Sequence, residues 1–379
     1  MSNGAVAEHA TEPGAFACRP EVAALPRYNA GLSVAAVRSR YAVERIAKLA
    51  SNENPEGCSP HAIAALTDLR TLLRDYPDAP STAIRQTISE LTGWPASQVV
   101  VGNGSENLIE MLCLALLNRG DRVVTQNPCF GLHELYSVAM GATVDKVDFT
   151  AGLDFDLAAW HAACARPARM LMIANPSNPV GCALNGPDFE RVVAMAPPEA
   201  VLLIDEAYYE YAVGPAFPDA LAVLQRQQRP WIVLRTLSKA YGLAGIRLGY
   251  GLASSAQLVD ALERVRTPFN INAVAQAVAT AALQDQAYMQ ASVQRTVQTR
   301  ATLRQALEQD GYVVAPSHTN FLFFDAQEPA VALAERLLGH GVIVKAWREP
   351  GFESFIRVSI GTDAECQQFL SALRLTRSR

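Results

Sequence analysis

The sequence lacks the features that mark a secreted, membrane-spanning or nucleic-acid-binding protein. No apolar stretch in its 379 residues approaches the length of a membrane span. The first 20 residues carry Glu8, His9 and Glu12 instead of the apolar core of a signal peptide. Its 32 basic and 37 acidic residues give a net charge of −5, so it lacks the basic excess that attracts nucleic acid or an anionic membrane.

Cysteine is sparse and shows no pairing pattern. The seven cysteines are odd in number and scattered, and none forms a C-x-x-C pair. This argues against a disulfide framework or a zinc site and favours reduced thiols. We therefore expect a cytoplasmic protein without a metal, whose partners are small molecules.

The glycine pattern of a nicotinamide-binding fold is also incomplete. GNGSEN (102–107) and GYGLAS (249–254) both lack the third glycine of that fingerprint. GNGSEN joins a predicted strand to a predicted helix, so backbone N–H groups at the helix N-terminus could hold a phosphate. The alternative interpretation is a tight turn with Ser105 as the N-cap.

Short apolar runs, rich in valine and isoleucine, recur from about residue 98. Each is too short for a buried helix, and together they predict strands buried on both faces. Between several of them lie helical segments, such as SENLIEMLCLALLN (105–118), with apolar residues at helical spacing. This alternation predicts an α/β fold with a mostly parallel sheet flanked by helices. The runs cover residues 98–101, 122–125, 169–174, 201–204 and 231–234.

Three segments follow from these patterns. Residues 1–45 are predicted to form an N-terminal arm, residues 46–255 a large domain, and residues 256–379 a smaller C-terminal α+β domain. The small domain is expected to contain a long helical region near 273–309, a strand in TNFLFFD (319–325), a helix near 329–340, and strands in VIVKAW (342–347) and FIRVSIG (355–361).

One lysine stands out in TLSKAYGLAGIRLGY (236–250). Lys239 directly follows a predicted strand, and the only other charge in the stretch is Arg247. Ligands of parallel sheets bind at the carboxyl ends of the strands. A lysine that is partly desolvated there has a lowered pKa and can form a Schiff base. The structural alternative is an exposed lysine in a turn.

Other candidate site residues also follow predicted strands, and each has a structural alternative. Asp205 ends an apolar run, where a carboxylate needs a cationic partner, or it caps a helix, and Tyr208 lies three residues on. Asn178 belongs to NPSNPVG, which turn chemistry alone explains. Arg247 could bind a phosphate with its planar fork or form a surface ion pair. Arg357 could bind a carboxylate or face solvent.

In their order along the chain, these motifs resemble those of fold-type I pyridoxal-phosphate aminotransferases. Among them, the chain is most similar to the histidinol-phosphate aminotransferases, from about residue 22 to the C-terminus. TLSKAYGLAGIRLGY is highly specific, whereas NPSNPVG alone is not. The other matching stretches are LPRYNAG, SNENPEGCSP, YPD, GNGSEN, DEAYYEY and FIRVSIGT.

The resemblance implies a role for each matching residue. Lys239, Asp205 and Tyr208 would be catalytic: Lys239 bonds to pyridoxal 5'-phosphate, and Asp205 pairs with its pyridine nitrogen. Asn178 and Tyr208 would hydrogen-bond the ring oxygen, and Phe130 would stack on the ring. The remaining cofactor contacts would come from Gly104, Ser105, Glu106, Thr236, Ser238 and Arg247, and from Tyr76 of the other subunit of a homodimer. The substrate would contact Tyr28, Asn52, Lys345 and Arg357.

The implied activity is transamination, with L-histidinol phosphate as amino donor and 2-oxoglutarate as acceptor, in histidine biosynthesis. Two departures concern the substrate side: Glu56 stands where the family often has an aromatic residue, and Lys345 where some members have arginine. An aromatic amino acid aminotransferase and a pyridoxal-phosphate decarboxylase of the threonine-phosphate type remain alternatives. A cofactor-binding transcriptional regulator is disfavoured, because the residues before the first strand lack a helix-turn-helix pattern.

Overall fold

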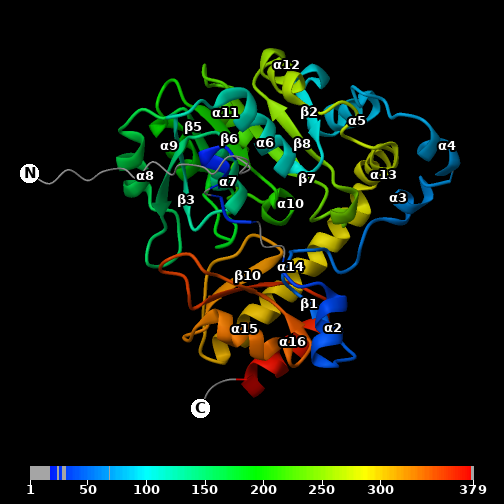
Figure 1. Ribbon diagram of the computed structural model, residues 1–379, viewed down its shortest axis with the longest axis vertical. Coiled ribbons are helices and arrows are strands. Elements are labelled where there is room, and N and C mark those ends of the chain that lie inside the picture. Colours follow the sequence, from blue (N-terminus) through cyan, green and yellow to red (C-terminus); the bar gives the residue numbers. More distant parts are fainter. Residues whose placement is uncertain (1–17, 24, 28–30, 68, 377–379) are drawn as a thin grey trace, which may run out of the picture.

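A seven-stranded sheet forms most of the upper part of the molecule in Figure 1. The structure is a computed structural model, and it describes residues 18–23, 25–27, 31–67 and 69–376. The strand order is β2-β8-β7-β6-β5-β3-β4, and only β8 runs antiparallel to its neighbours. The mostly parallel α/β architecture predicted from the sequence is therefore confirmed. The strands are β2 (Val99–Gly102), β3 (Arg122–Asn127), β4 (Thr143–Asp148), β5 (Met170–Ala174), β6 (Val201–Asp205), β7 (Trp231–Thr236) and β8 (Gly249–Ala253).

All five predicted runs form strands of this sheet, and two further strands escaped prediction. β4 carries charged residues, as an edge strand does, and so lacks a continuous apolar run. β8 contains Gly249 and Gly251, which match two of the three glycines of the nicotinamide-binding fingerprint. Both glycines are needed for packing: a Cβ at Gly249 would lie 2.3 Å from the Ser105 backbone nitrogen, and one at Gly251 would lie 2.7 Å from Ile232. GYGLAS is therefore a strand and not a nucleotide loop.

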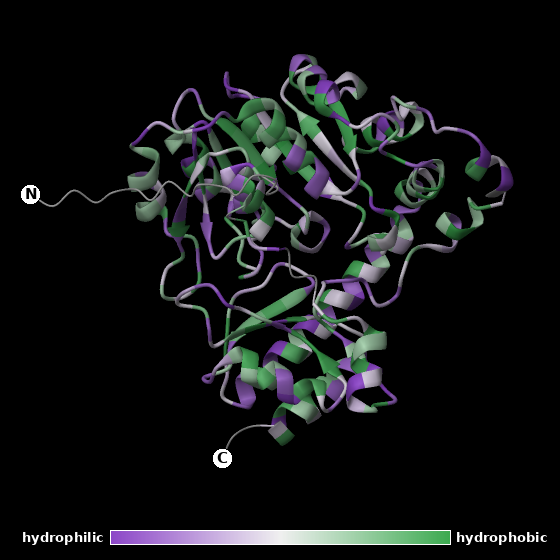
Figure 2. Cartoon of the chain, in the orientation of Figure 1, coloured by the Kyte–Doolittle hydropathy of each residue, from purple (hydrophilic) through white to green (hydrophobic). Residues whose placement is uncertain are grey.

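Helices cover both faces of the large sheet. One face packs on α6 and α12 through Leu108, Leu112 and Leu262, and the other packs on α5, α9 and α13 through residues such as Ile88 and Phe189. Figure 2 accordingly shows hydrophobic colour along the central strands and mixed colour along the surrounding helices. These helices are α3 (Pro60–Ala64), α4 (Leu69–Arg74), α5 (Thr82–Thr92), α6 (Ser105–Leu116), α7 (Gly131–Ala139), α8 (Leu157–Cys164), α9 (Gly186–Met195), α10 (Tyr209–Ala212), α11 (Ala220–Leu224), α12 (Ala256–Val265) and α13 (Ala273–Gln284).

A second, antiparallel sheet lies below the first in Figure 1 and has the order β12-β13-β10-β9. Its core includes Ile356 and Val358 of β13, which pack on α15 and α16. The predicted C-terminal strands and helix are therefore present. The elements are α14 (Gln286–Gln309), β9 (Val313–Val314), β10 (Phe321–Asp325), α15 (Ala330–Leu338), β11 (Val342–Ile343), β12 (Lys345–Ala346), β13 (Phe355–Ser359) and α16 (Asp363–Thr376).

Most of the N-terminal segment packs on elements beside this smaller sheet, whereas its helix α1 (Pro20–Ala23) packs on α7. The segment also contains α2 (Val34–Tyr41) and β1 (Ala47–Lys48), and β1 pairs with β11 in parallel. Val37 of α2 packs on Leu338 and Ile343. No helix in the described part of the chain combines the length and apolarity needed to cross a bilayer.

The helical region predicted near 273–309 is two helices, because α13 ends and α14 begins around Asp285. α14 joins the two cores: Met289 belongs to the core of the large sheet, whereas Leu303 and Leu307 belong to that of the small sheet. We propose that the small domain starts within α14 and also includes the α2–β1 segment, since α12 and α13 pack on the large sheet.

Candidate active site

A pocket of about 940 Å³ lies between the two sheets, at the carboxyl ends of β5, β6 and β7. It is the crevice expected for a parallel sheet. Most residues singled out from the sequence line it, although they come from segments spread over some 300 positions. They are Asn52, Ser105, Glu106, Phe130, Asn178, Asp205, Tyr208, Thr236, Ser238, Lys239, Arg247, Lys345 and Arg357.

Of the predicted residues that the structure describes, two are not among those that line the pocket. Gly104 is the N-cap of α6, directly beside it. Tyr76 is 83% exposed and stacks on Phe269, with the ring centroids 4.7 Å apart. Tyr28 lies outside the described residues. The exposed position of Tyr76 leaves its ring accessible to another molecule.

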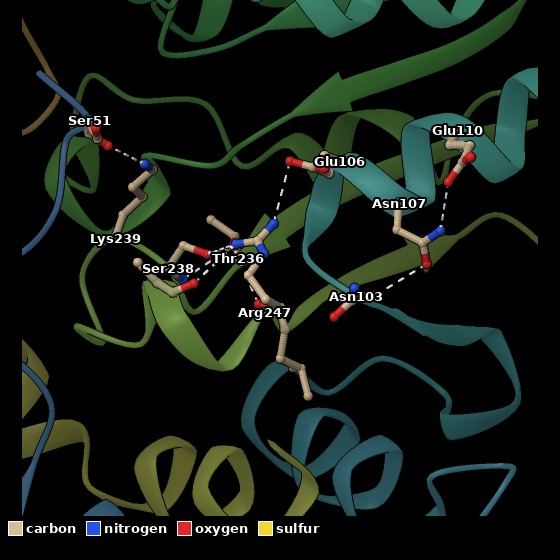
Figure 3. A network of polar contacts seen from close by, with 11 residues as sticks. Ser51, Asn103, Glu106, Asn107, Glu110, Thr236, Ser238, Lys239 and Arg247 are labelled. Carbon is tan, nitrogen blue, oxygen red and sulfur yellow. Dashed lines mark hydrogen bonds and ion pairs between the residues drawn. The ribbon is translucent and has the colours of Figure 1, made fainter. Parts of the chain in front are cut away.

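Lys239 follows β7 and lines the pocket. Its Nζ donates to the Ser51 carbonyl oxygen at 3.0 Å, as Figure 3 shows. Burial, together with the cations of Arg357 and Arg247, lowers the pKa of Lys239 to about 8, against the opposing effect of Glu53 and Asp205. A large fraction of the amine is therefore neutral near pH 8 and able to act as a nucleophile or base.

The region around Arg247 and the start of α6 has the character of an anion site. Arg247 donates to the Ser238 hydroxyl at 3.3 Å and pairs with Glu106 at 3.4 Å (Figure 3). Gly104 adopts φ 86°, a backbone conformation that favours glycine, and a Cβ there would also lie 2.4 Å from an Arg247 nitrogen. Ser105 is the first residue of α6 and not its N-cap. An arginine fork thus adjoins the N-terminus of a 12-residue helix.

Asp205, the last residue of β6, is 5% exposed, and its partner was missed in the sequence. His133 of α7 is fully buried, and its Nε2 lies 3.3 Å from Asp205 Oδ2. The backbone N–H of Ala207 donates to the other carboxylate oxygen at 3.1 Å. His133 lies one helical turn after Phe130, and this spacing was the available signal. The carboxylate is thereby held at the floor of the pocket.

Asn52 links the two sheets through the site. Its side-chain nitrogen donates to the Tyr208 hydroxyl at 2.8 Å, and its Oδ1 accepts from the Ser359 hydroxyl at 3.0 Å. Asn320 of the small domain also donates to the Asn52 carbonyl oxygen at 2.9 Å. The backbone of Asn52 is left-handed, at φ 57°, which asparagine tolerates better than most residues. The sequence predicted Asn52 in the site but not this bridging role.

Arg357 of β13 is only 8% exposed, so the interpretation as a solvated strand face is wrong. Its guanidinium donates to Asn178 Oδ1 at 2.6 Å and to the Ala50 carbonyl oxygen at 2.8 Å. It also lies over the rings of Phe321 and Trp347, at 5.3 and 5.8 Å from their centroids. The cation is therefore fixed in orientation at the pocket wall.

The two departures from the family pattern differ in their structural position. Lys345 lines the pocket opposite Arg357 in the β12–β13 register, and burial together with Arg357 and Arg348 lowers its pKa. Glu56 is not among the lining residues and instead pairs with Arg295 of α14. The expectation that Glu56 lies on the substrate side is not met, because its carboxylate faces a helix that joins the two cores.

Comparison with known proteins agrees with the resemblance found in the sequence motifs. Residues 44–373 match the family model for aminotransferase class I and II. The chain is 46% identical to histidinol-phosphate aminotransferase 3 of Rhizobium meliloti, covering 94% of this chain and 96% of that protein. It is 44% identical to histidinol-phosphate aminotransferase 1 of Mesorhizobium japonicum, covering 94% and 97%.

A solved structure is also similar over nearly the whole chain. It is the histidinol-phosphate aminotransferase from Sinorhizobium meliloti in complex with pyridoxal-5'-phosphate, with a TM-score of 0.87, 26% identity, and coverage of 96% of this chain and 98% of that one. The match to the family model and the identity to these relatives agree with the pocket built around Lys239, Asp205 and Arg357. On this evidence, the chain belongs to the class I and II aminotransferase family.

Proposed function

We propose that the chain is a pyridoxal-phosphate-dependent aminotransferase that transfers the amino group of L-histidinol phosphate to 2-oxoglutarate, in histidine biosynthesis. The observation that carries the proposal is a single pocket with a low-pKa lysine, a buried carboxylate and two separate cationic regions. The names of the relatives, at 44–46% identity, support histidinol phosphate as the amino donor.

The residues of the pocket fit pyridoxal phosphate. Lys239 offers an amine to the aldehyde, and Asp205, held by His133, offers a carboxylate to the pyridine nitrogen. Arg247 and Ser238, beside the N-terminus of α6, suit the phosphate. In this assignment Ser105, Glu106 and Thr236 complete the phosphate site, and Phe130 covers the ring.

Pyridoxal phosphate, when bound, supplies an electron sink for the electrons of the broken Cα–H bond. Lys239 Nζ removes the proton from the substrate Cα as general base, and its lowered pKa suits this task near neutral pH. The Asp205 carboxylate would hold a proton on the ring nitrogen. Tyr208, oriented by Asn52, and Asn178, oriented by Arg357, would donate hydrogen bonds to the ring oxygen.

The substrate side favours a second anion. Arg357 and Lys345 lie on adjacent strands, opposite each other in register, and Arg348 also lines the pocket. Because Arg247 serves the cofactor phosphate, this second cationic region is available for the phosphate of histidinol phosphate or the carboxylate of 2-oxoglutarate. A donor and an acceptor that both carry an anion can thus use the same groups in turn.

The test is the absorbance of the cofactor-loaded enzyme when single amines are added without a keto acid. Histidinol phosphate should bleach the absorbance of the Lys239-bound cofactor at lower concentrations than phenylalanine does, with formation of a keto product. Faster bleaching by phenylalanine would instead favour an aromatic aminotransferase. Release of carbon dioxide from threonine phosphate would favour the decarboxylase.

We further infer that the enzyme is a cytoplasmic homodimer with composite sites. Tyr76 is outside its own pocket and largely exposed, and its ring is held by Phe269. Ile63 and Leu73, in neighbouring helices, are also exposed apolar residues. In a two-fold dimer, Tyr76 would reach the cofactor phosphate of the partner subunit.

A further inference from the structure

One ionic cluster at the boundary of the two sheets has no part in the chemistry above. Lys146 of β4 donates to Glu134 of α7 at 2.7 Å and to Glu349 at 3.0 Å. Glu349 belongs to the segment between β12 and β13, so this ammonium joins the large sheet to the small one. Burial lowers the pKa of Lys146, but the hydrogen bonds to both carboxylates raise it more, so the ammonium stays charged.

The cluster continues toward the substrate side of the pocket. The second carboxylate oxygen of Glu349 accepts from Trp347 Nε1 at 2.6 Å. The ring of Trp347 lies 5.8 Å from the Arg357 guanidinium and packs edge-on against Phe323. Lys345, two residues before Trp347, pairs with Arg357 in the strand register. A chain of contacts therefore runs from Lys146 to the cationic side chains of the pocket.

Beneath this cluster lies a thiol. Cys129 is 2% exposed, and its Sγ and one oxygen each of Glu134 and Glu349 all lie within 4.8 Å of one another. Such a group resembles a metal site, but the Lys146 ammonium already bridges both carboxylates. Burial, together with the carboxylates of Glu349 and Glu134, raises the pKa of Cys129 to about 12, against the opposing effect of Lys146. The thiol is therefore protonated, and the segment above it shields it from solvent.

We propose that Lys146 is a positioning residue for substrate binding. By holding Glu349, it fixes the Trp347–Glu349 segment over Cys129 and sets the position of Arg357 and Lys345 toward the anionic group of the substrate. This rests on the proposed function only for the identity of the substrate. Cys129 and Glu349 line the same pocket, but no side chain of the cluster is assigned a contact with the cofactor, so we expect cofactor affinity to be retained when Lys146 is replaced.

The test compares Lys146→Met with Lys146→Arg, which keeps the charge, and with Arg226→Met as the matched control. Arg226 forms an exposed ion pair with Glu190 on the outside of the large domain, at 2.8 Å. In the cofactor-loaded enzyme, Lys146→Met should raise the KM for histidinol phosphate about 10-fold, with kcat within about two-fold. Cofactor affinity should be unchanged, and Lys146→Arg should restore most of the KM. The control should behave as wild type.

A second measurement does not depend on activity. Alkylation of the loaded enzyme by iodoacetamide, followed by peptide mass spectrometry, should modify Cys129 about 10-fold faster in Lys146→Met, while the buried Cys113 stays protected. The gain is expected because release of the segment exposes the thiol, although loss of the ammonium raises the pKa of Cys129 further. Unchanged KM and unchanged Cys129 labelling would overturn the proposal, as would equal losses of cofactor and substrate affinity. If wild type does not use histidinol phosphate, the proposed function fails, and the labelling alone decides whether Lys146 holds the segment.

Discussion

The cofactor side and the substrate side of the pocket are built in different ways. Asp205 and Thr236 end two buried parallel strands of the large sheet, Ser238 lies two residues after Thr236, and all three are less than 10% exposed. Lys345 and Arg348 instead lie in short strand and loop segments of the small domain, and Arg348 is exposed. The cofactor side is fixed by the sheet, whereas the substrate side depends on how the small domain sits against it.

This difference predicts that the groups on the substrate side can change more independently than those on the cofactor side. A change in the sheet would move several catalytic groups together, because neighbouring strands share hydrogen bonds and a packed core. A change in the β12–β13 region, such as lysine at position 345, alters only the groups that meet the substrate. We therefore expect substitutions on the cofactor side to affect the rate constant and those on the substrate side to affect KM.

The largest effect is expected for Lys239→Ala. The variant should lose the covalent adduct that borohydride traps in the wild type, and kcat should fall by roughly 10⁴-fold or more, because both nucleophile and base are removed. The measurements are mass spectrometry of the reduced protein and steady-state rates. A trapped adduct on a different lysine of the wild-type enzyme would contradict the assignment.

The second-largest effect is expected for Asp205→Ala. The variant should still bind the cofactor through Lys239 and the phosphate site, but single-turnover rates should fall roughly 10²- to 10³-fold, because a fixed charge that stabilises the reacting ring is lost. Stopped-flow absorbance with histidinol phosphate measures the rate. Asp205→Glu is the control that keeps the charge. Near-normal single-turnover rates in the alanine variant would rule out this role.

Arg357→Lys tests the substrate side. The charge remains but the planar fork is lost, so the hydrogen bonds that hold it to Asn178 and Ala50 are weakened. We expect KM for histidinol phosphate to rise about 10- to 100-fold, with a smaller change in kcat. Equilibrium binding of the cofactor is the control measurement. A fall in kcat without a change in KM would instead indicate that Arg357 acts on the cofactor side of the pocket.

Tyr76→Phe should have the smallest effect, since it removes one hydroxyl. Loss of one hydrogen bond should weaken cofactor binding about 2- to 10-fold. Mixing these chains with Lys239→Ala chains should give heterodimers in which one site carries both defects and the other neither. Activity at limiting cofactor should then exceed that of either parent. Heterodimers that form without this gain would argue against a composite site.

The sequence predicted the cofactor side better than the substrate side, for physical reasons. Strand ends are marked by short apolar runs followed by polar residues, so Asp205 and Lys239 could be placed on one sheet edge from sequence alone. His133 was missed because its spacing from Phe130 places it near the site but does not show that it contacts Asp205 of β6. Glu56 and Arg295 form an ion pair because α14 runs from one core to the other. Local sequence patterns do not predict pairs that are this far apart in the chain.

The length of α14 has a mechanical consequence. Its 24 residues span about 36 Å, and its C-terminal half is packed into the small core. Near its other end, Ser292 accepts a hydrogen bond from Asn54, which also donates to the Ala240 carbonyl oxygen beside Lys239. Because the helix is this long, rotating it by about 3° about one end displaces its other end by about 2 Å. A movement of the small domain would therefore shift the hydrogen bonds that hold the backbone next to the reactive lysine.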